Sequence, residues 1–341
     1  MMSFHRSCRL HAGLAALAAW VIWLCPLTAV ADVRTLTATG EYRMGDNDTK
    51  TDAKRLALLD AKRQALEQVG TYLEGVTEVK NLSVTKDEIR SYTAGIVEVV
   101  EQASRTMLEG ETTVVRVDVT VKVDTAVVTK QIGELRTNEL AKEELLHAKE
   151  EADRRRKELD EKNQQLAALK GGAAETAVQQ RQQVLAQADA NELLARTWQV
   201  PAEPKDEAAT TASTATPEER AKYRTMLEQA LRLDANNPWV HFKLGHLYGS
   251  EGNLDAAIRE YRTAIHLQPE APRPHLALGH ALLAQGKKQQ GAEEMYAYLM
   301  LAEKKPGHQP MIERTNKKLH ELERRGIRPS QERRRLFSGP R

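Results

Sequence analysis

The chain has 341 residues, of which 29% are charged and only 4% are aromatic. A composition so poor in aromatic side chains argues against one very large hydrophobic core and favours two or three smaller, mostly helical units. The formal net charge of +2, from 50 basic and 48 acidic side chains, excludes nucleic-acid binding driven by overall charge.

Residues 1–31 have the pattern of a secretory signal peptide. Arg6 and Arg9 form a basic start, an apolar run follows over residues 14–27, and Ala29-Val30-Ala31 supplies the small residues of a cleavage site. The alternative is an uncleaved inner-membrane anchor, because the apolar run is nearly long enough to span a bilayer. The expected location of the mature protein is the periplasm.

Both cysteines, Cys8 and Cys25, lie inside this leader. Cleavage before Asp32 therefore leaves a mature chain without cysteine, which excludes disulfides, thiolate metal sites and cysteine nucleophiles. An exported chain without cysteine fits the bacterial periplasm better than a disulfide-stapled extracellular setting.

Residues 32–130 are expected to form a small α+β domain. Residues 33–42 alternate like a strand, and residues 51–73 place their apolar side chains on one helical face. A second helix is predicted to start at the capping box that begins with Thr85. Residues 96–124 then predict a hairpin, whose second strand carries alternating valines. We expect an antiparallel sheet with two helices on its valine face.

This region resembles the N-terminal domain of flagellar assembly protein T and related domains of small envelope lipoproteins. The resemblance lies in the strand into Gly40-Glu41-Tyr42, the alanine-rich helix from Asp52 through Ala65, and the closing valine-rich hairpin. It implies a structural or assembly role in the envelope and no catalytic residues.

Residues 131–200 predict long helices. A heptad frame places six small or apolar residues on two seam positions, which favours a coiled coil and a homo-oligomer. The seam residues are Leu145, Ala148, Ala152, Leu159, Leu166 and Leu169. The alternative is a single solvated helix held by charge pairs one turn apart. After Gly171-Gly172 the helical pattern resumes, and it either folds back or continues the stalk.

Residues 201–217 have no large apolar side chain and predict a flexible linker. Beyond them lies an internal repeat of 34 residues, which relates Leu244-Gly245 to Leu278-Gly279 and Gly252 to Gly286. This period and these positions resemble the tetratricopeptide repeat (TPR), an α-helical solenoid in which stacked helix pairs bury their faces in series.

The expected array covers residues 218–325. Residues 218–235 resemble the second helix of a preceding repeat, and residues 309–325 are expected to form a capping helix. The second copy departs from the family pattern at Gly291, Met295 and Tyr298, which puts the regularity of its second helix in doubt. Residues 326–341 are left as a basic tail.

The resemblance to TPR arrays implies that the first helix of each pair lines a concave groove that binds a protein partner. The corresponding residues are Trp239, Phe242, His246, Arg273, Leu276, His280 and Leu283. Exposed Trp, Phe and Arg are favoured anchors for partners. The alternative is that Trp239 and Phe242 pack against the preceding helix.

Three other site types are disfavoured. The repeated histidines lack metal-ligand spacing, since His241 and His246 do not share a helical face. Asp46-Asn47-Asp48 lacks the glycine and distal glutamate of a calcium loop and predicts a turn with a helix cap. No phosphate-binding loop or hydrolase motif is present. We therefore expect no metal, no cofactor and no enzyme activity.

Residues 304–341 contain 12 basic and 4 acidic side chains, a net charge of +8. This charge suggests adhesion to an anionic envelope surface, and its alternative is a solvated helix with a disordered tail. The combined hypothesis is a periplasmic, non-enzymatic adaptor of an envelope, flagellar or secretion assembly. The alternative function is a structural oligomeric stalk with no groove ligand.

Overall fold

The computed structural model describes residues 33–76, 79, 84–137, 139–169, 172–197, 216–303, 308–328 and 330. The leader, linker residues 201–215 and tail residues 331–341 lie outside this part of the chain. Within the described ranges, no helix has both the length and the apolar composition that a membrane crossing requires.

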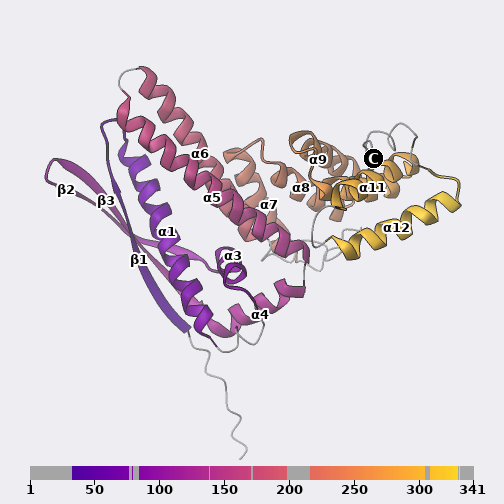
Figure 1. Cartoon of the computed structure of the whole chain (residues 1–341), viewed down its shortest axis with the longest axis horizontal. Coiled ribbons are helices and arrows are strands. Elements are labelled where there is room, and N and C mark those ends of the chain that lie inside the picture. The colour runs from indigo at the N-terminus through magenta and orange to yellow at the C-terminus, as the bar shows by residue number, and fades with distance from the viewer. Residues whose placement is uncertain are drawn as a thin grey trace, which may run out of the picture.

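Three strands form the predicted small antiparallel sheet (Figure 1). They are β1 (Val33–Arg43), β2 (Val99–Glu109) and β3 (Thr112–Asp124), in the order β1-β3-β2. The alternating valines of β3 are buried, as their spacing predicts. They are Val115, Val117, Val119, Val121 and Val123.

Helix α1 (Lys50–Gly75) covers the buried face of the sheet. Its alanines, Ala53, Ala57, Ala61 and Ala65, pack against Val115, Val117 and Val119. Small side chains let the helix approach closely, and Gly40 on β1 completes the fit. A Cβ at Gly40 would lie only 2.1 Å from the Ala57 carbonyl oxygen. Helix α3 (Lys86–Ile96) begins with the predicted capping box of Thr85 and Glu88.

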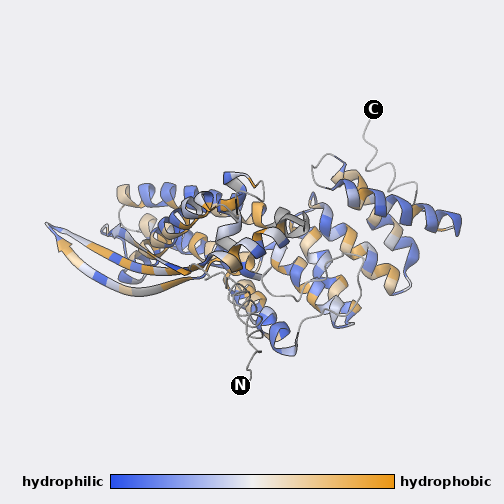
Figure 2. Ribbon diagram, turned by 90° about the horizontal axis from the view of Figure 1, so that it is seen from below, coloured by the Kyte–Doolittle hydropathy of each residue, from blue (hydrophilic) through white to orange (hydrophobic). Residues whose placement is uncertain are grey.

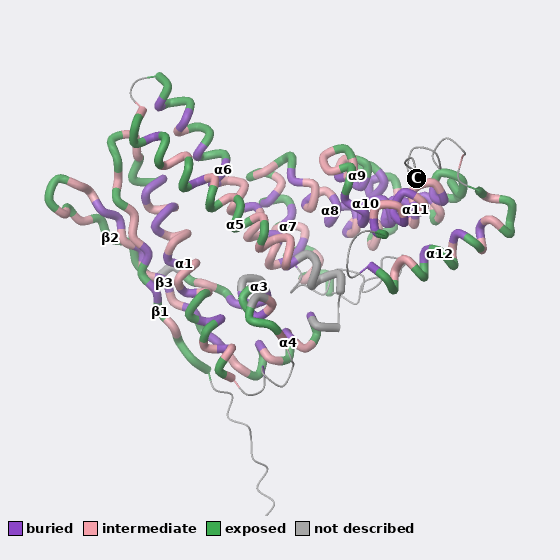
Figure 3. Tube along the Cα trace, in the orientation of Figure 1, coloured by how far each residue is buried: buried purple, intermediate pink, exposed green. Residues whose placement is uncertain are grey.

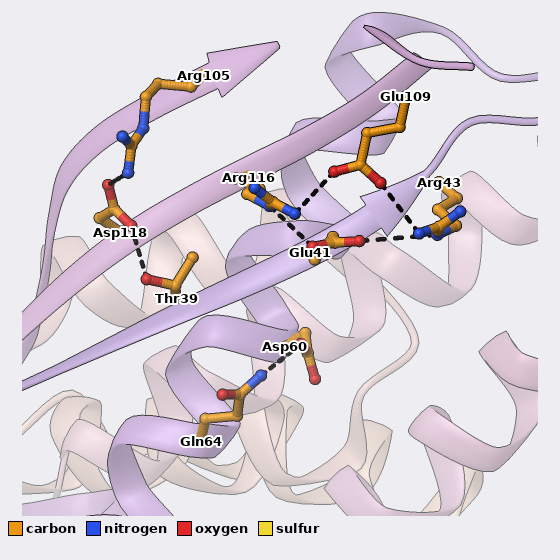
Figure 4. A network of polar contacts seen from close by, with 9 residues as sticks. All are labelled: Thr39, Glu41, Arg43, Asp60, Gln64, Arg105, Glu109, Arg116 and Asp118. Atoms are coloured by element: carbon orange, nitrogen blue, oxygen red, sulfur yellow. Dashed lines mark hydrogen bonds and ion pairs between the residues drawn. The ribbon is translucent and has the colours of Figure 1, made fainter. Parts of the chain in front are cut away.

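The other face of the sheet is polar (Figure 4). Arg116 bridges Glu41 and Glu109, each at 2.8 Å, across neighbouring strands. Asp118 accepts hydrogen bonds from Thr39 and Arg105. Because successive side chains of a strand point to opposite faces of the sheet, these cross-strand pairs lie on one face, which is charged and solvated.

Helix α4 (Thr125–Thr137) starts directly after β3, within the range assigned to the α+β domain. Val128, Ile132 and Leu135 join the same core as Val69 and Leu73 of α1. The core of the N-terminal region therefore extends past residue 130, because α4 packs against α3, β3 and the next helix of the chain.

Helices α5 (Glu139–Ala168) and α6 (Gly172–Thr197) form an antiparallel hairpin that lies along α1 (Figure 1). Leu159 packs with Val184 and Leu185 of α6 and with Leu56 of α1. The seam leucines Leu145, Leu159 and Leu166 are buried within the chain, whereas Ala152 is exposed. A long coiled coil is not shown among the described residues: α5 folds back on α6, and α1 and α6 together cover Leu159 of the seam.

Arg181 fixes this hairpin to the N-terminal region. Its side chain is fully buried and pairs with Asp48, and its other terminal nitrogen lies 3.6 Å from Asp52. Asp48 also accepts hydrogen bonds from the Gly45 amide at 2.7 Å and the Tyr42 hydroxyl at 3.0 Å. Burial and the Asp48 carboxylate raise the pKa of Tyr42 to about 12. The residues that hinted at calcium therefore form a turn with a buried ion pair.

The C-terminal half is a stack of helices that follows the 34-residue period. They are α7 (Pro217–Leu233), α8 (Pro238–Ser250), α9 (Leu254–Leu267), α10 (Pro272–Ala284), α11 (Lys288–Ala302) and α12 (Gln309–Arg324). Gly252 and Gly286 adopt positive φ angles of 79° and 85° at equivalent turns. The repeat is as the sequence predicts, and α12 lies where the sequence places a capping helix.

The departures of the second copy do not interrupt α11, which runs unbroken with Gly291, Met295 and Tyr298 buried. A Cβ at Gly291 would lie 2.8 Å from the Gly279 carbonyl oxygen, so the missing side chain permits close contact between α10 and α11. The second helix of the second copy is therefore regular. The smaller Gly291 at one position accompanies the larger Tyr298 at another.

Helix α6 takes the place of a first helix in the preceding pair. Ala190 and Leu194 of α6 pack with Tyr223 and Leu227 of α7, and this cluster continues into Leu244 of α8. The stack therefore comprises three pairs, α6/α7, α8/α9 and α10/α11, closed by α12. Buried residues are concentrated around α10 and α11 (Figure 3), while hydrophobic and hydrophilic residues alternate along strands and helices alike (Figure 2).

Candidate protein-binding site

Trp239 stands at the start of α8, on the side facing the α5–α6 hairpin. The side-chain oxygen of Asn237 accepts hydrogen bonds from the Trp239 and Val240 amides and so caps the helix. The half-buried indole donates from Nε1 to Nε2 of His147 on α5, at 3.3 Å. The two rings lie 4.8 Å apart between centroids. Trp239 thus contacts an element far from the repeats in sequence.

Phe242 and Arg273 are buried beside Trp239. Phe242 is 1% exposed and meets the rings of Trp239 and His246 edge-on, at centroid distances of 5.7 and 4.5 Å. The Arg273 guanidinium lies 5.0 Å from the centre of the Phe242 ring and 5.7 Å from that of Trp239. This arrangement is a cation–π contact within the stack. Phe242 and Arg273 therefore hold α8 and α10 together in this structure.

The remaining predicted residues of α10 face the capping helix. Leu276 is buried with Leu319 and Leu322 of α12. His280 is mostly buried, and burial together with the nearby Lys318 ammonium lowers its pKa to about 4. Leu283 is half-buried in the same cluster as Leu276. The structure thus splits the seven predicted groove residues between a region near α5 and a region covered by α12.

A partly open cleft lies where α5, α6 and α8 meet. Its lining is largely apolar and includes two residues that carry charge, Glu151 and Lys243. It is lined by Leu145, His147, Ala148, Glu151, Asn191, Leu194, Ala195, Trp239 and Lys243. Of the predicted groove residues, only Trp239 lines this cleft. Lys243 was missed, although its spacing of four residues from Trp239 places both on one side of α8.

No group of three or more histidine, cysteine, aspartate or glutamate side chains with the geometry of a metal site occurs among the residues that the structure places. His246 instead packs 5.5 Å from the Tyr261 ring, measured between centroids. The histidines of the repeats therefore take part in packing and hydrogen bonding.

Comparison with known proteins supports the repeat assignment. The family model described as TPR repeat matches residues 247–286. A curated uncharacterized protein of Haemophilus influenzae is 34% identical over 68 residues, which are 20% of this chain and 38% of that protein. This chain thus matches well under half the length of that relative.

Among solved structures, the type III secretion translocator chaperone SycD of Yersinia enterocolitica is similar over 32% of this chain and 75% of its own, with 17% identity and a TM-score of 0.31. SycD in complex with a peptide of the translocator YopD has the same identity and TM-score and is covered over 83%. Together, the 34-residue period, the stacked pairs and the family match show that the C-terminal region contains tetratricopeptide repeats, which are protein-interaction modules.

Proposed function

We propose that the protein is a non-enzymatic adaptor that binds a partner protein at the cleft between α5, α6 and α8. The observation that carries this proposal is Trp239, a half-buried aromatic side chain of the first repeat that lines a largely apolar cleft. Buried aromatic anchors in such settings supply much of the energy of protein recognition. The cleft suits one apolar side chain of a partner segment.

The test is a pull-down from envelope extract with a variant that fills the cleft. Ala148 is half-buried in the cleft lining, whereas Ala152 is exposed one turn further along α5. Ala148→Phe should abolish partner recovery, and the matched variant Ala152→Phe should preserve it. Equal recovery with both variants would contradict the cleft assignment, and no recovery with the unmodified protein would favour the structural stalk without a groove ligand.

The pull-down uses these alanines because Phe242→Ala would remove a core side chain. Phe242 is almost fully buried, so its truncation is expected to destabilise the stack by about 3–5 kcal/mol. Trp239→Ala is a useful second variant, because loss of the indole should weaken binding more than folding.

We further propose a periplasmic location and a role in an envelope, flagellar or secretion assembly. The basic start, apolar run and Ala29-Val30-Ala31 of the leader support export, and the resemblance of the α+β domain to that of flagellar assembly protein T supports the assembly role. Cell fractionation tests the location. Release of a form starting near Asp32 from the periplasm is expected, and recovery of the full-length chain in the membrane fraction would favour the anchor.

Homo-oligomerisation through residues 131–200 remains a prediction. Leu145, Leu159 and Leu166 are covered by this chain's own helices, so an oligomer would have to use other side chains of α5 and α6. Light scattering on the mature protein measures the mass directly, and a monomer would contradict the oligomer and the oligomeric stalk alike.

The basic C-terminus is proposed to adhere to an anionic lipid surface. Leu319 and Leu322 face the stack, while Arg314, Lys317 and Arg324 are exposed on α12. Attraction of this kind is electrostatic and is screened by salt. Cosedimentation with vesicles that contain phosphatidylglycerol should fall in high salt and in the variant Lys317→Glu with Arg324→Glu. Equal cosedimentation with neutral vesicles would contradict the proposal.

A further inference from the structure

A histidine on α8 is held between two hydrogen-bond acceptors. Nδ1 of His241 lies 2.7 Å from Oε2 of Glu260 on α9, and Nε2 lies 3.0 Å from the carbonyl oxygen of Ala235 in the preceding loop. One side chain thus joins both helices of the first repeat to the loop that enters it.

The second repeat has the same arrangement 34 residues later. Nδ1 of His275 on α10 lies 2.7 Å from Oε2 of Glu294 on α11, and Nε2 lies 3.2 Å from the Pro269 carbonyl oxygen. His275 is buried at 4% exposure. We call the pairs His241–Glu260 and His275–Glu294 the His–Glu clamps.

The geometry of the first clamp bears on the protonation of the His241 imidazole. A carboxylate and a backbone carbonyl can only accept hydrogen bonds, and a neutral imidazole has one N–H to donate. Both contacts of each histidine are therefore satisfied only when both ring nitrogens carry a proton. We propose that the His241–Glu260 clamp is a pH-responsive fastening of the repeat stack, closed at mildly acidic pH and loosened when His241 loses its proton.

The charges around the clamps agree with this state. Burial by itself would lower the pKa of His241, but the hydrogen bonds from Glu260 and Ala235 and the charges of Glu260 and Asp234 outweigh it and raise the pKa above the ordinary value. Around His275 the carboxylate comes from Glu294 on α11, and the loop residue equivalent to Asp234 is the uncharged Gln268.

The sign of the pH effect follows from the raised pKa. A histidine whose pKa is higher in the folded than in the unfolded chain stabilises the fold fully below the unfolded value, near pH 6.5, and this contribution is lost as the pH rises through the folded value. His280 titrates in the opposite direction with a pKa of about 4, so its effect falls mainly at more acidic pH. The inference concerns the stack itself and does not depend on the proposed partner site.

The experiment measures the melting temperature of the mature protein at about pH 6 and about pH 8. The clamp at His241 should contribute a decrease of up to about 2–4 °C at the higher pH, the shift that about 1 kcal/mol produces in a large domain. In the variant Glu260→Gln, His241 loses the carboxylate that accepts its hydrogen bond, and most of this part of the decrease should vanish. The matched control replaces two exposed histidines, His266→Gln with His320→Gln, and should leave the decrease unchanged.

A histidine titration by NMR on the unmodified protein decides the question even where the Glu260→Gln variant fails to fold. The resonances of His241 should remain those of imidazolium above the ordinary pKa of histidine. A neutral His241 imidazole at about pH 6 would overturn the proposal. An unchanged pH dependence of melting in a folded Glu260→Gln variant would overturn it as well.

Discussion

Replacing Gly40 with alanine tests whether the contact between β1 and α1 sets the stability of the N-terminal region. The added Cβ would lie 2.1 Å from the Ala57 carbonyl oxygen, 2.3 Å from the Ala61 amide nitrogen and 2.8 Å from the Ala61 Cα. Ordinary contacts of a Cβ are 3.4–4 Å, so the shortfall exceeds 1 Å for the first two atoms. All three atoms belong to the backbone of α1 and cannot rotate away.

The helix must therefore move off the sheet along its whole alanine face. Overpacking of this kind costs about 1–3 kcal/mol, and the rigid neighbours place Gly40→Ala at the upper end. The gain from removing a glycine within a strand offsets roughly 0.5–1 kcal/mol. We expect a net loss of about 2–2.5 kcal/mol, which is a large part of the total stability of an ordinary domain.

Urea unfolding followed by far-ultraviolet circular dichroism measures this loss. The midpoint should fall by about 1 M or more for a urea dependence of roughly 2 kcal/mol per M. Gly133→Ala on α4 is the matched control, because a Cβ there meets nothing within 4 Å and improves helix propensity. A Gly40→Ala variant with an unchanged midpoint would refute the packing argument.

Three further substitutions probe other contacts. Gly245→Ala should lower the free energy of unfolding by about 2 kcal/mol, because the added Cβ would lie 2.4 Å from the packed ring of Tyr261. An unchanged melting temperature would contradict the close approach of α8 and α9. Arg181→Met should cost about 3–5 kcal/mol by leaving the buried Asp48 carboxylate without its cation, and Asp48→Asn in addition should recover part of that loss. Because the pKa of His280 is lowered, its contribution to stability is full above about pH 6.5 and is lost as the pH falls towards 4. His280→Gln should remove this loss and so flatten the acid side of the stability profile by up to roughly 3 kcal/mol. An unchanged profile would show that His280 is not buried as described.

Features that depend on short-range patterns could be predicted from the sequence. The valines of β3, the capping box at Thr85 and the turn glycines Gly252 and Gly286 all lie where their spacing places them. Each is determined by residues at most a few positions apart, or by a repeat of the same short unit. Such signals do not need knowledge of the tertiary contacts.

The partner of the α5 seam could not be predicted in the same way. A heptad pattern indicates that Leu159 is covered, but it does not say whether another chain or this one covers it. Here Leu56, more than a hundred residues earlier, supplies part of the cover. The specific docking depends on the pair of Arg181 and Asp48, which the sequence could not reveal because the pairing joins segments 133 positions apart.

The candidate site shows the same limit. The repeat pattern places Trp239 on the first helix of a pair, but it cannot reveal the contact with His147, 92 positions away. Nor does it show that Phe242 and Arg273 stack on each other and bury one another. The partly open cleft follows from the position of the hairpin, which the sequence left undecided between folding back and continuing the stalk.

Helix α6 has a mechanical consequence. It precedes the stretch 201–217 in sequence, yet it packs both on α1 and on α7. Helix α6 therefore belongs to the packing of both the N-terminal region and the repeat stack. The two halves are held together by these contacts, and not only by the covalent connection between α6 and α7. Protease cleavage between residues 201 and 215 should leave two fragments that migrate as a single particle, and a new chain terminus placed there should not separate the two halves.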